Sequence, residues 1–254
     1  MTTTLIVLAH PDRRSFNGAW ADATAEASEA LGHTVLWSDL VSMGFDPVES
    51  ARHYPGYASD RAFDPLKAQE EAAEAATLPT DIAAEVAKVI AADRIIFHFP
   101  LWWFAPPAIL KGWFDRVFAH GRLHTVDSRF DKGLCKGKKA LFCVTTGSSE
   151  AESAFNGKEG DVRMLLWPAA YTLHYLGFTV LEPVVVHGVH GYHKEGKLED
   201  LKNRLQDAIR DQRHRIASFQ DHQVWQFNSD DDFDEDGRLR QSRPAYSWFI
   251  RHQR

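Results

Sequence analysis

Short apolar runs alternate with amphipathic segments along most of this chain. The runs are rich in β-branched residues, which is typical of strands buried on both faces of a sheet. We expect strands at residues 5–9, 34–37, 94–99, 139–145 and 178–187. Between them, apolar residues recur every three or four positions, which predicts helices at residues 15–32, 80–92, 106–119, 162–176 and 198–219. This alternation predicts an α/β fold with parallel strands joined by right-handed crossovers.

The first loop narrows the order of the strands. It reads HPDRRSFNG and lacks the GxGxxG that dinucleotide-binding sheets place after their first strand. We therefore expect a flavodoxin-like, doubly wound, five-stranded parallel sheet with order 2-1-3-4-5. In that order the loops after strands one, three and four converge at one edge of the sheet.

Two segments stand outside this pattern. Residues 44–79 carry aromatic residues, prolines and the polar run KAQEEAAEAA, and they are interpreted as a surface insertion. The domain is therefore expected to span residues 1–220, with a tail over 221–254. The tail has an acidic run from Asp230 to Asp236 and then an apolar group that includes Trp248 and Phe249. Since such a group is unfavourable on a free tail, we expect the tail to pack on its own or a partner subunit.

Composition limits the class of partner and the location. The net charge is −6 and no cluster of five or six Lys and Arg occurs, so neither nucleic acid nor an anionic membrane is the expected partner. The N-terminus lacks a basic region before its short apolar run, which argues against a secretory signal. The longest apolar stretch, 95–110, is interrupted by His98 and three prolines and is too short to span a membrane. A soluble, cytoplasmic protein is expected.

The cysteines and histidines give little indication of a metal. Cys135 and Cys143 form no CxxC, and Cys143 falls in a predicted strand, where a buried apolar role is favoured. His187, His190 and His193 have a spacing that could bind a metal, but no carboxylate or cysteine lies among them. No metal site is therefore predicted.

The loop after the third strand carries exposed-looking aromatic residues. Pro100 ends that strand, and Pro106 and Pro107 fall in the first turn of the next helix, where a missing N–H is tolerated. Between them, at the carboxyl end of the sheet, stands the aromatic triplet 102–104. Flat apolar side chains at that edge suit a flat ring system, although adjacent Trp and Phe equally often fill a core or an oligomer interface.

The other two converging loops offer complementary chemistry. The first leads into a helix N-terminus and adds Arg13, Arg14 and Ser15, a combination suited to phosphate. The third, TTGSS at 145–149, is small enough for its N–H groups to approach the edge of a planar ring. A Ser at a helix start is usually only a cap, and TTGSS usually only a turn. Their meeting at one edge predicts a site for a planar cofactor that bears phosphate.

These segments resemble a known family of enzymes. LIVLAHPDRRSFN, FHFPLWWFAPPAILKGWFDRVF, TTGSS, NGKEGDVRMLLWP and LHYLGFTVLEP are similar to the FAD-dependent NAD(P)H:quinone oxidoreductases of the DT-diaphorase type and their bacterial relatives. The resemblance runs from about residue 4 to about residue 205. It implies a flavodoxin-like homodimer with FAD, rather than FMN, at each active site. It also implies ping-pong hydride transfer from NAD(P)H through the flavin to a quinone in the same pocket.

The resemblance and the chemistry of the three loops together assign site residues, although Trp102 and Ser148 stand where the family has Gln and Gly. The expected cofactor-binding residues are His10, Ser15, Phe16, Asn17, Pro100, Leu101, Trp102, Trp103, Phe104, Thr145, Thr146, Gly147 and Ser148. The expected catalytic residues are Trp103, Phe104, Gly147, Ser153 and Glu159. The expected substrate-binding residues are Trp103, Phe104, His124 and Tyr175, the last of them lent by the partner subunit.

Several of these positions depart from the family. Ser153 and Glu159 stand where the family has the Tyr and His thought to neutralise the reduced flavin. A carboxylate there would be repulsive unless protonated or turned away. We therefore hypothesise that N–H groups of the 146–148 loop, and Lys158, take over that role. His124 and Val126 stand where the family has Tyr, which leaves the acceptor open.

Three functions remain in competition at this point. The leading hypothesis is an enzyme that reduces quinones, with nitro- or azo-aromatic compounds as possible side substrates. The second is a flavin-binding regulatory subunit of a glutathione-gated potassium efflux system, docked through the acidic, aromatic tail. The third is a one-electron carrier, which is disfavoured because the pocket is predicted to admit a second flat molecule.

Overall fold

The computed structural model describes residues 1–57 and 62–253, and it has a parallel sheet at its centre. The strands follow the order β2-β1-β3-β4-β5, as predicted, and a further strand, β6, also pairs with β4. All pairings are parallel. The bounds are β1 Thr3–Leu8, β2 Thr34–Asp39, β3 Arg94–Pro100, β4 Lys139–Thr145, β5 Thr179–Val180 and β6 Val184–Val186.

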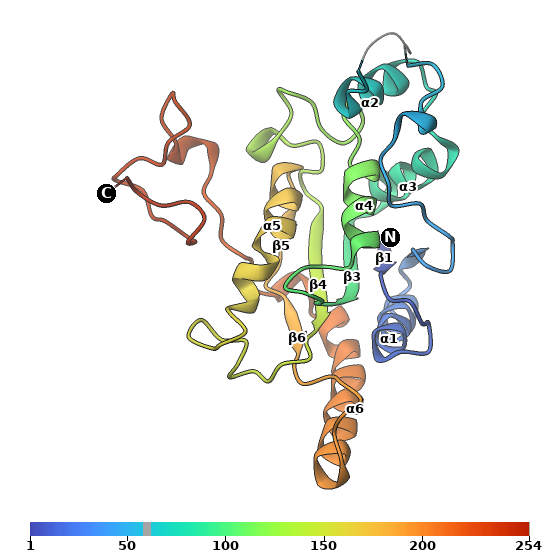
Figure 1. The fold of residues 1–254 in the computed structure, drawn as a ribbon, viewed down its shortest axis with the longest axis vertical. Helices are drawn as coiled ribbons and strands as arrows, with labels where there is room; N and C mark the ends of the chain where they lie inside the picture. Colours follow the sequence, from blue (N-terminus) through green and yellow to red (C-terminus); the bar gives the residue numbers. More distant parts are fainter. Residues whose placement is uncertain (58–61, 254) are drawn as a thin grey trace.

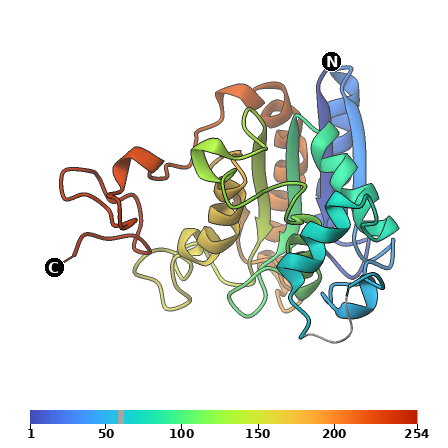
Figure 2. The same cartoon turned by 90° about the horizontal axis from the view of Figure 1, so that it is seen from above.

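Helices cover both faces of this sheet (Figures 1 and 2). Their bounds are α1 Phe16–Ala30, α2 Pro65–Glu74, α3 Thr80–Ala91, α4 Ala108–Val117, α5 Val162–Tyr175 and α6 Glu195–Ala217. On one face, Ile95 and Phe97 of β3 pack with apolar residues of α3, α4 and α5. On the other face, Ile96 packs with Trp20 of α1 and Ile216 of α6. Alternate residues of one strand thus build two cores, as the unbroken apolar runs require.

Most boundaries differ from prediction by one to three residues, and the differences at three elements have structural interest. The last strand is not continuous over 178–187, because Pro183 cannot donate to the ladder, and β5 and β6 lie on either side of it. Helix α4 begins at Ala108 rather than at residue 106, with Pro107 as its N-cap. Helix α6 begins three residues before Leu198, at Glu195, and its N-terminal half projects below the sheet (Figure 1).

The predicted insertion, 44–79, contains one full helix. The polar run forms α2, whose N-cap Asp64 accepts hydrogen bonds from the N–H groups of Leu66 and Lys67. Gln69 of α2 ties the insertion to the body, donating to the carbonyl of Asp115 and accepting from the N–H of His120. Residues 58–61 of this predicted insertion lie outside the described residues.

The tail has two parts with different surroundings. Its first part returns to the body, where the N–H of Trp225 donates to the carbonyl of Val180 and the Trp225 ring is buried. The rest forms a lobe that projects away from the sheet (Figures 1 and 2). Phe249 of the lobe stacks on Trp167 of α5, whereas Trp248 is 70% exposed. No helix in the described part of the chain is long and apolar enough to cross a bilayer.

Candidate active site

The loops after β1, β3 and β4 meet at the carboxyl edge of the sheet. Asn17, at the start of α1, donates from Nδ2 to the Thr145 hydroxyl at 3.0 Å, which joins the first loop to the third. The ring of His10 lies 6.0 Å from that of Trp102, centroid to centroid. The N–H of Leu101 donates to the carbonyl of Thr145 at 2.8 Å. The predicted convergence is therefore present, and it rests on direct contacts between all three loops.

The aromatic loop is a tight hairpin turn with a strained backbone. Trp102 and Ala105 exchange two backbone hydrogen bonds, and both residues between them have positive φ: 51° at Trp103 and 63° at Phe104. Glycine or asparagine normally occupies such positions, because other side chains strain the backbone there. Trp103 is nevertheless 93% exposed. A large apolar side chain held in a strained, solvated position gains nothing for the isolated fold and points to a ligand.

The N-terminus of α1 offers unpaired polar groups at the same edge. Ser15 caps the helix, its hydroxyl accepting from the N–H of Gly18. Among the described residues, the N–H groups of Phe16 and Asn17 have no partner. Asn17 is 3% exposed, and its Oδ1 is buried without a hydrogen bond. A ligand that brings an anion to the helix end and a hydroxyl to Oδ1 would satisfy all three groups.

Arg13 and Arg14, which the sequence offered for a phosphate, both pair with carboxylates. Arg13 is engaged by Asp22 and Asp39 and lies over the ring of Trp37. Arg14 is paired with Asp12 at 2.7 Å, with its side chain 90% exposed. Both guanidinium groups are thus committed to carboxylates, which leaves the N–H groups of α1 as the better candidates for an anion.

The 145–149 loop presents two free N–H groups. The N–H of Thr146 donates to the carbonyl of Val186, so it is not available for the role that we hypothesised. The N–H groups of Gly147 and Ser148 have no partner in the described part of the chain. A Cβ added at Gly147 would meet nothing within 4 Å, so its surroundings are open. Two adjacent donors and open space suit the edge of a planar ring.

His187 braces this loop and was not predicted as a site residue. The Thr146 hydroxyl donates to the carbonyl of Ser148, so it accepts from Nδ1 of His187, 3.0 Å away. Burial lowers the pKa of His187, which favours the neutral ring. Its position just after an apolar strand was the signal that could have identified it.

A cavity of about 430 Å³ opens between the aromatic turn and the 146–159 loop. All five predicted catalytic residues line it. The complete lining is Leu101, Trp103, Phe104, Thr146, Gly147, Ser148, Glu152, Ser153, Glu159, Val162 and Leu165. The hydroxyls of Ser148 and Ser153 are 2.6 Å apart, which holds the two sides of the loop together.

Glu152 is a further lining residue that sequence reasoning missed. It accepts from the N–H and hydroxyl of Ser149 and pairs with Lys158 at 3.1 Å. These donors, the Ser149 N–H first, lower the pKa of Glu152 to about 2. Lys158 is therefore bound to a neighbouring carboxylate, which weakens the hypothesis that it stabilises a reduced flavin. The irregular loop sequence gave no periodic signal for this pairing.

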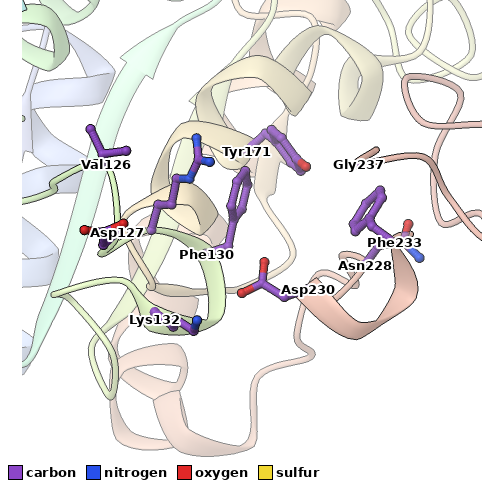
Figure 3. Close-up of a pocket in the computed structure, with 10 residues that line it drawn as sticks. Val126, Asp127, Phe130, Lys132, Tyr171, Asn228, Asp230, Phe233 and Gly237 are labelled. Carbon is purple, nitrogen blue, oxygen red and sulfur yellow. The ribbon is translucent and has the colours of Figure 1, made fainter. Parts of the chain in front are cut away.

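Two predicted substrate residues do not line this cavity. His124 and Tyr175 pack against each other, with ring centroids 5.5 Å apart, and burial lowers the pKa of His124. Val126 lines a different cavity, of about 420 Å³. Figure 3 shows Phe130 and Tyr171 on one side of that cavity and Phe233 of the tail lobe on the other. The predicted site residues thus form two groups within one chain.

The loop histidines do not converge on a metal. The rings of His190 and His193 stack with centroids 3.8 Å apart, and Nε2 of His193 is bonded to the carbonyl of Gly188. Among the described residues, no group of three or more His, Cys, Asp or Glu is arranged to hold a metal ion.

Comparison with known proteins agrees with this geometry. The model of a flavodoxin-like fold family matches residues 2–209. NAD(P)H dehydrogenase (quinone) 1 of Cavia porcellus is 43% identical over 187 residues, which cover 73% of this chain and 68% of the relative. Ribosyldihydronicotinamide dehydrogenase (quinone) of Homo sapiens is 40% identical over 183 residues, covering 71% and 79%. The chain belongs to the flavodoxin-like family of NAD(P)H:quinone oxidoreductases.

Solved structures extend the similarity to the tail. A Klebsiella pneumoniae protein assigned as a quinone reductase superposes with a TM-score of 0.84 at 29% identity, covering 94% of each chain. The NAD(P)H:quinone oxidoreductase of Methanothermobacter marburgensis gives 0.61 at 25% identity, covering 84% of this chain and 96% of that one. The first match covers more of this chain than residues 1–220 alone, so it includes part of the tail.

Within this quinone oxidoreductase family, the chain carries its own chemistry at the cavity. Glu159 is half-buried and lines the cavity, and its carboxylate has no hydrogen bond or ion pair among the described residues. Ser153 is 4% exposed and bonded to Ser148. Both departures noted in the sequence therefore lie at the site itself, and one of them adds an unpaired charge to its wall.

Proposed function

We propose that this protein is a flavin-dependent NAD(P)H:quinone oxidoreductase that uses FAD. The observation that carries the proposal is the meeting of the Asn17 orphan oxygen, the strained aromatic turn and the free N–H groups of Gly147 and Ser148. The names of the curated relatives support the choice of donor and acceptor. They favour an enzyme and give no support to the alternative of a potassium-efflux subunit.

The residues present fit a flavin. The N–H groups of Phe16 and Asn17 would hold phosphate, and Asn17 Oδ1 would accept from a ribityl hydroxyl. The N–H groups of Gly147 and Ser148 would donate to the ring edge and stabilise negative charge there. FAD, when bound, supplies a two-electron carrier that takes a hydride from NAD(P)H and gives it to the quinone, donor and acceptor using the pocket in turn.

The remaining side chains would shape the donor and acceptor pocket. Trp103 and Phe104 offer aromatic faces to a nicotinamide or quinone ring. Ser153 would keep the 146–159 loop in place through its hydrogen bond to Ser148. Donor and acceptor would bind in turn against these same aromatic faces.

A homodimer is part of the proposal. His124, Tyr175 and the Val126 cavity would face the cavity of a partner subunit and complete its active site. This accounts for the separation of the predicted site residues into two groups within one chain. The molecular mass in solution tests it: about twice 28.7 kDa is expected, and a monomer that is fully active would contradict it.

The activity is tested directly with purified protein. We expect NAD(P)H oxidation that depends on added quinone, with parallel lines in double-reciprocal plots because donor and acceptor share one pocket. Chromatography of the released flavin should give FAD; release of FMN would correct the cofactor but leave the activity. Protein that carries flavin but reduces no quinone would refute the proposed activity.

A further inference from the structure

The cavity at the aromatic turn has walls of opposite character. One side is apolar and aromatic, built by Leu101, Trp103 and Phe104. The other side carries two carboxylates, Glu152 and Glu159, and no Lys, Arg or His is among the described residues that line the cavity. A flat molecule that enters this space therefore meets negative charge and no lining cation.

Glu152 is a fixed charge. Its Oε2 accepts from both the N–H and the hydroxyl of Ser149, at 3.0 and 2.9 Å. These bonds hold its pKa at about 2, so it is ionised throughout the physiological range. Because it is tied to the loop at two points, Glu152 cannot turn away from the cavity without breaking those bonds.

Glu159 adds a second carboxylate that forms no ion pair of its own among the described residues. Its backbone N–H donates to the carbonyl of Glu152, which places the two residues side by side. Lys158 is the cation closest to them in sequence, and its Nζ pairs with Glu152 at 3.1 Å. One cation thus serves two carboxylates, and this wall keeps an excess negative charge.

The loop that carries these residues is braced. The hydroxyls of Ser148 and Ser153 are bonded, and the N–H of Ser153 donates to the carbonyl of Ser149. At its far end, the N–H of Val162 donates to the carbonyl of Ser153. The carboxylates are therefore presented by a structured loop, so their field acts on whatever binds in the cavity.

We propose that Glu152 and Glu159 select the electron acceptor by charge, so that the enzyme reduces neutral or cationic quinones and discriminates against anionic ones. This inference rests on the proposed function and names the class of acceptor. The donor meets no such barrier, because the dihydronicotinamide ring is uncharged and its phosphates lie at the other end of a molecule longer than the cavity. An acceptor that bears a sulfonate or carboxylate on its ring brings that charge into the cavity.

Steady-state kinetics with a matched pair of acceptors tests this selection. The pair is a naphthoquinone and the same naphthoquinone bearing a ring sulfonate, and the measured quantity is the ratio of their kcat/KM values, sulfonate over neutral. Glu159→Gln should raise this ratio about threefold to tenfold, as expected for removing one charge near a partly solvated site. Glu152→Gln should act in the same direction, the double variant should exceed either, and the effects should shrink at high salt.

Two further variants of the same loop carry different predictions. Glu150→Gln removes an exposed carboxylate of the same loop that does not line the cavity, so the ratio should hardly change. Lys158→Gln removes the shared counterion and should lower the ratio. Glu152→Gln loses bonds to Ser149 and could fail to fold. Glu159→Gln then still tests the inference, because the Glu159 carboxylate makes no hydrogen bond or ion pair among the described residues.

A binding measurement separates selection from chemistry. Naphthalene sulfonate and naphthalene methanol are titrated into the flavin-loaded protein, with quenching of tryptophan fluorescence as the readout, since Trp103 lines the cavity. The sulfonate should bind more weakly, and Glu159→Gln should reduce the difference. A double variant with an unchanged ratio, or a Glu150→Gln ratio that rises as much as that of Glu159→Gln, would overturn the selection and leave the proposed activity intact. Wild-type protein that reduces neither quinone would overturn the proposed activity itself.

Discussion

Two glutamates of this chain show how structural and functional polar groups differ. Glu85 of α3 is fully buried, and its carboxylate accepts from Ser38 at 2.6 Å, Trp113 at 2.8 Å and Lys88 at 2.6 Å. Glu159 lines the candidate active site, and its carboxylate makes no hydrogen bond or ion pair among the described residues. The first satisfies three donors between α3, α4 and β2 and thus serves the fold. The carboxylate of the second makes no contact that stabilises the fold, which indicates a role toward a ligand in the cavity.

Other polar groups around Glu85 and in the active-site loops show the same contrast between paired and unpaired groups. The surroundings of Glu85 are buried and paired, whereas the active-site loops have an orphan amide oxygen at Asn17, free N–H groups and an exposed, strained Trp103. At the active-site loops the unsatisfied groups are available to a ligand, whereas the paired, buried groups around Glu85 stabilise the fold.

The largest expected effect is on stability and comes from Glu85. Glu85→Ala should lower the free energy of unfolding by about 3–5 kcal/mol, because it leaves the buried Ser38 hydroxyl and Trp113 Nε1 without their acceptor and removes the ion-pair partner of the half-buried Lys88. Glu159→Ala should change it by less than about 0.5 kcal/mol, as for a surface position with no contacts. Urea denaturation of the two variants measures both. Equal losses would mean that the contrast between the two glutamates is wrong.

The second effect is on flavin affinity. Asn17→Ala removes the orphan oxygen together with the bond to Thr145, and it should weaken FAD binding about tenfold or more, as for the loss of a buried hydrogen bond. Thr145→Val is the matched control, since it breaks the same link but keeps Asn17 Oδ1. Quenching of flavin fluorescence gives the dissociation constants. If the control loses as much affinity as Asn17→Ala, the oxygen does not contact the cofactor.

The third effect is on flavin affinity again, and it tests whether the open space beside Gly147 holds the flavin ring. Gly147→Ala should leave the unfolding free energy within about 0.5 kcal/mol, because the added methyl meets nothing within 4 Å and φ is not positive. The same methyl should weaken flavin binding about fivefold or more by crowding the ring edge. Thermal unfolding and flavin titration are compared on one preparation. Unchanged flavin affinity would mean that the flavin ring does not lie beside Gly147.

The smallest effect is expected at the aromatic turn. Trp103→Gly should lower kcat/KM for a neutral quinone about threefold to tenfold, the amount expected for losing one aromatic contact. Its stability should change by less than about 1 kcal/mol, since relief of the positive φ offsets the greater freedom of glycine in the unfolded chain. A large loss of stability with unchanged kinetics would assign Trp103 to the fold instead.

The sequence was most informative where apolar runs and loop position decide the outcome. The runs ending at Pro100 and Thr145 were predicted as the third and fourth strands, and the strand order followed from the five strands and from a first loop without GxGxxG. The role of Arg13 could not be predicted, because its pairing with Asp22 and Asp39 depends on how β2 lies beside α1. Glu152 was missed for a related reason: its partners Ser149 and Lys158 come together only when an irregular loop folds back on itself.

The central claim is that three loops at one edge of the sheet bind a flavin, and its most direct test is a titration of the flavin-free protein with FAD. We predict saturation at one FAD per chain, accompanied by quenching of the exposed tryptophan fluorescence. Protein that takes up neither FAD nor FMN, while its circular dichroism shows it to be folded, would contradict the account.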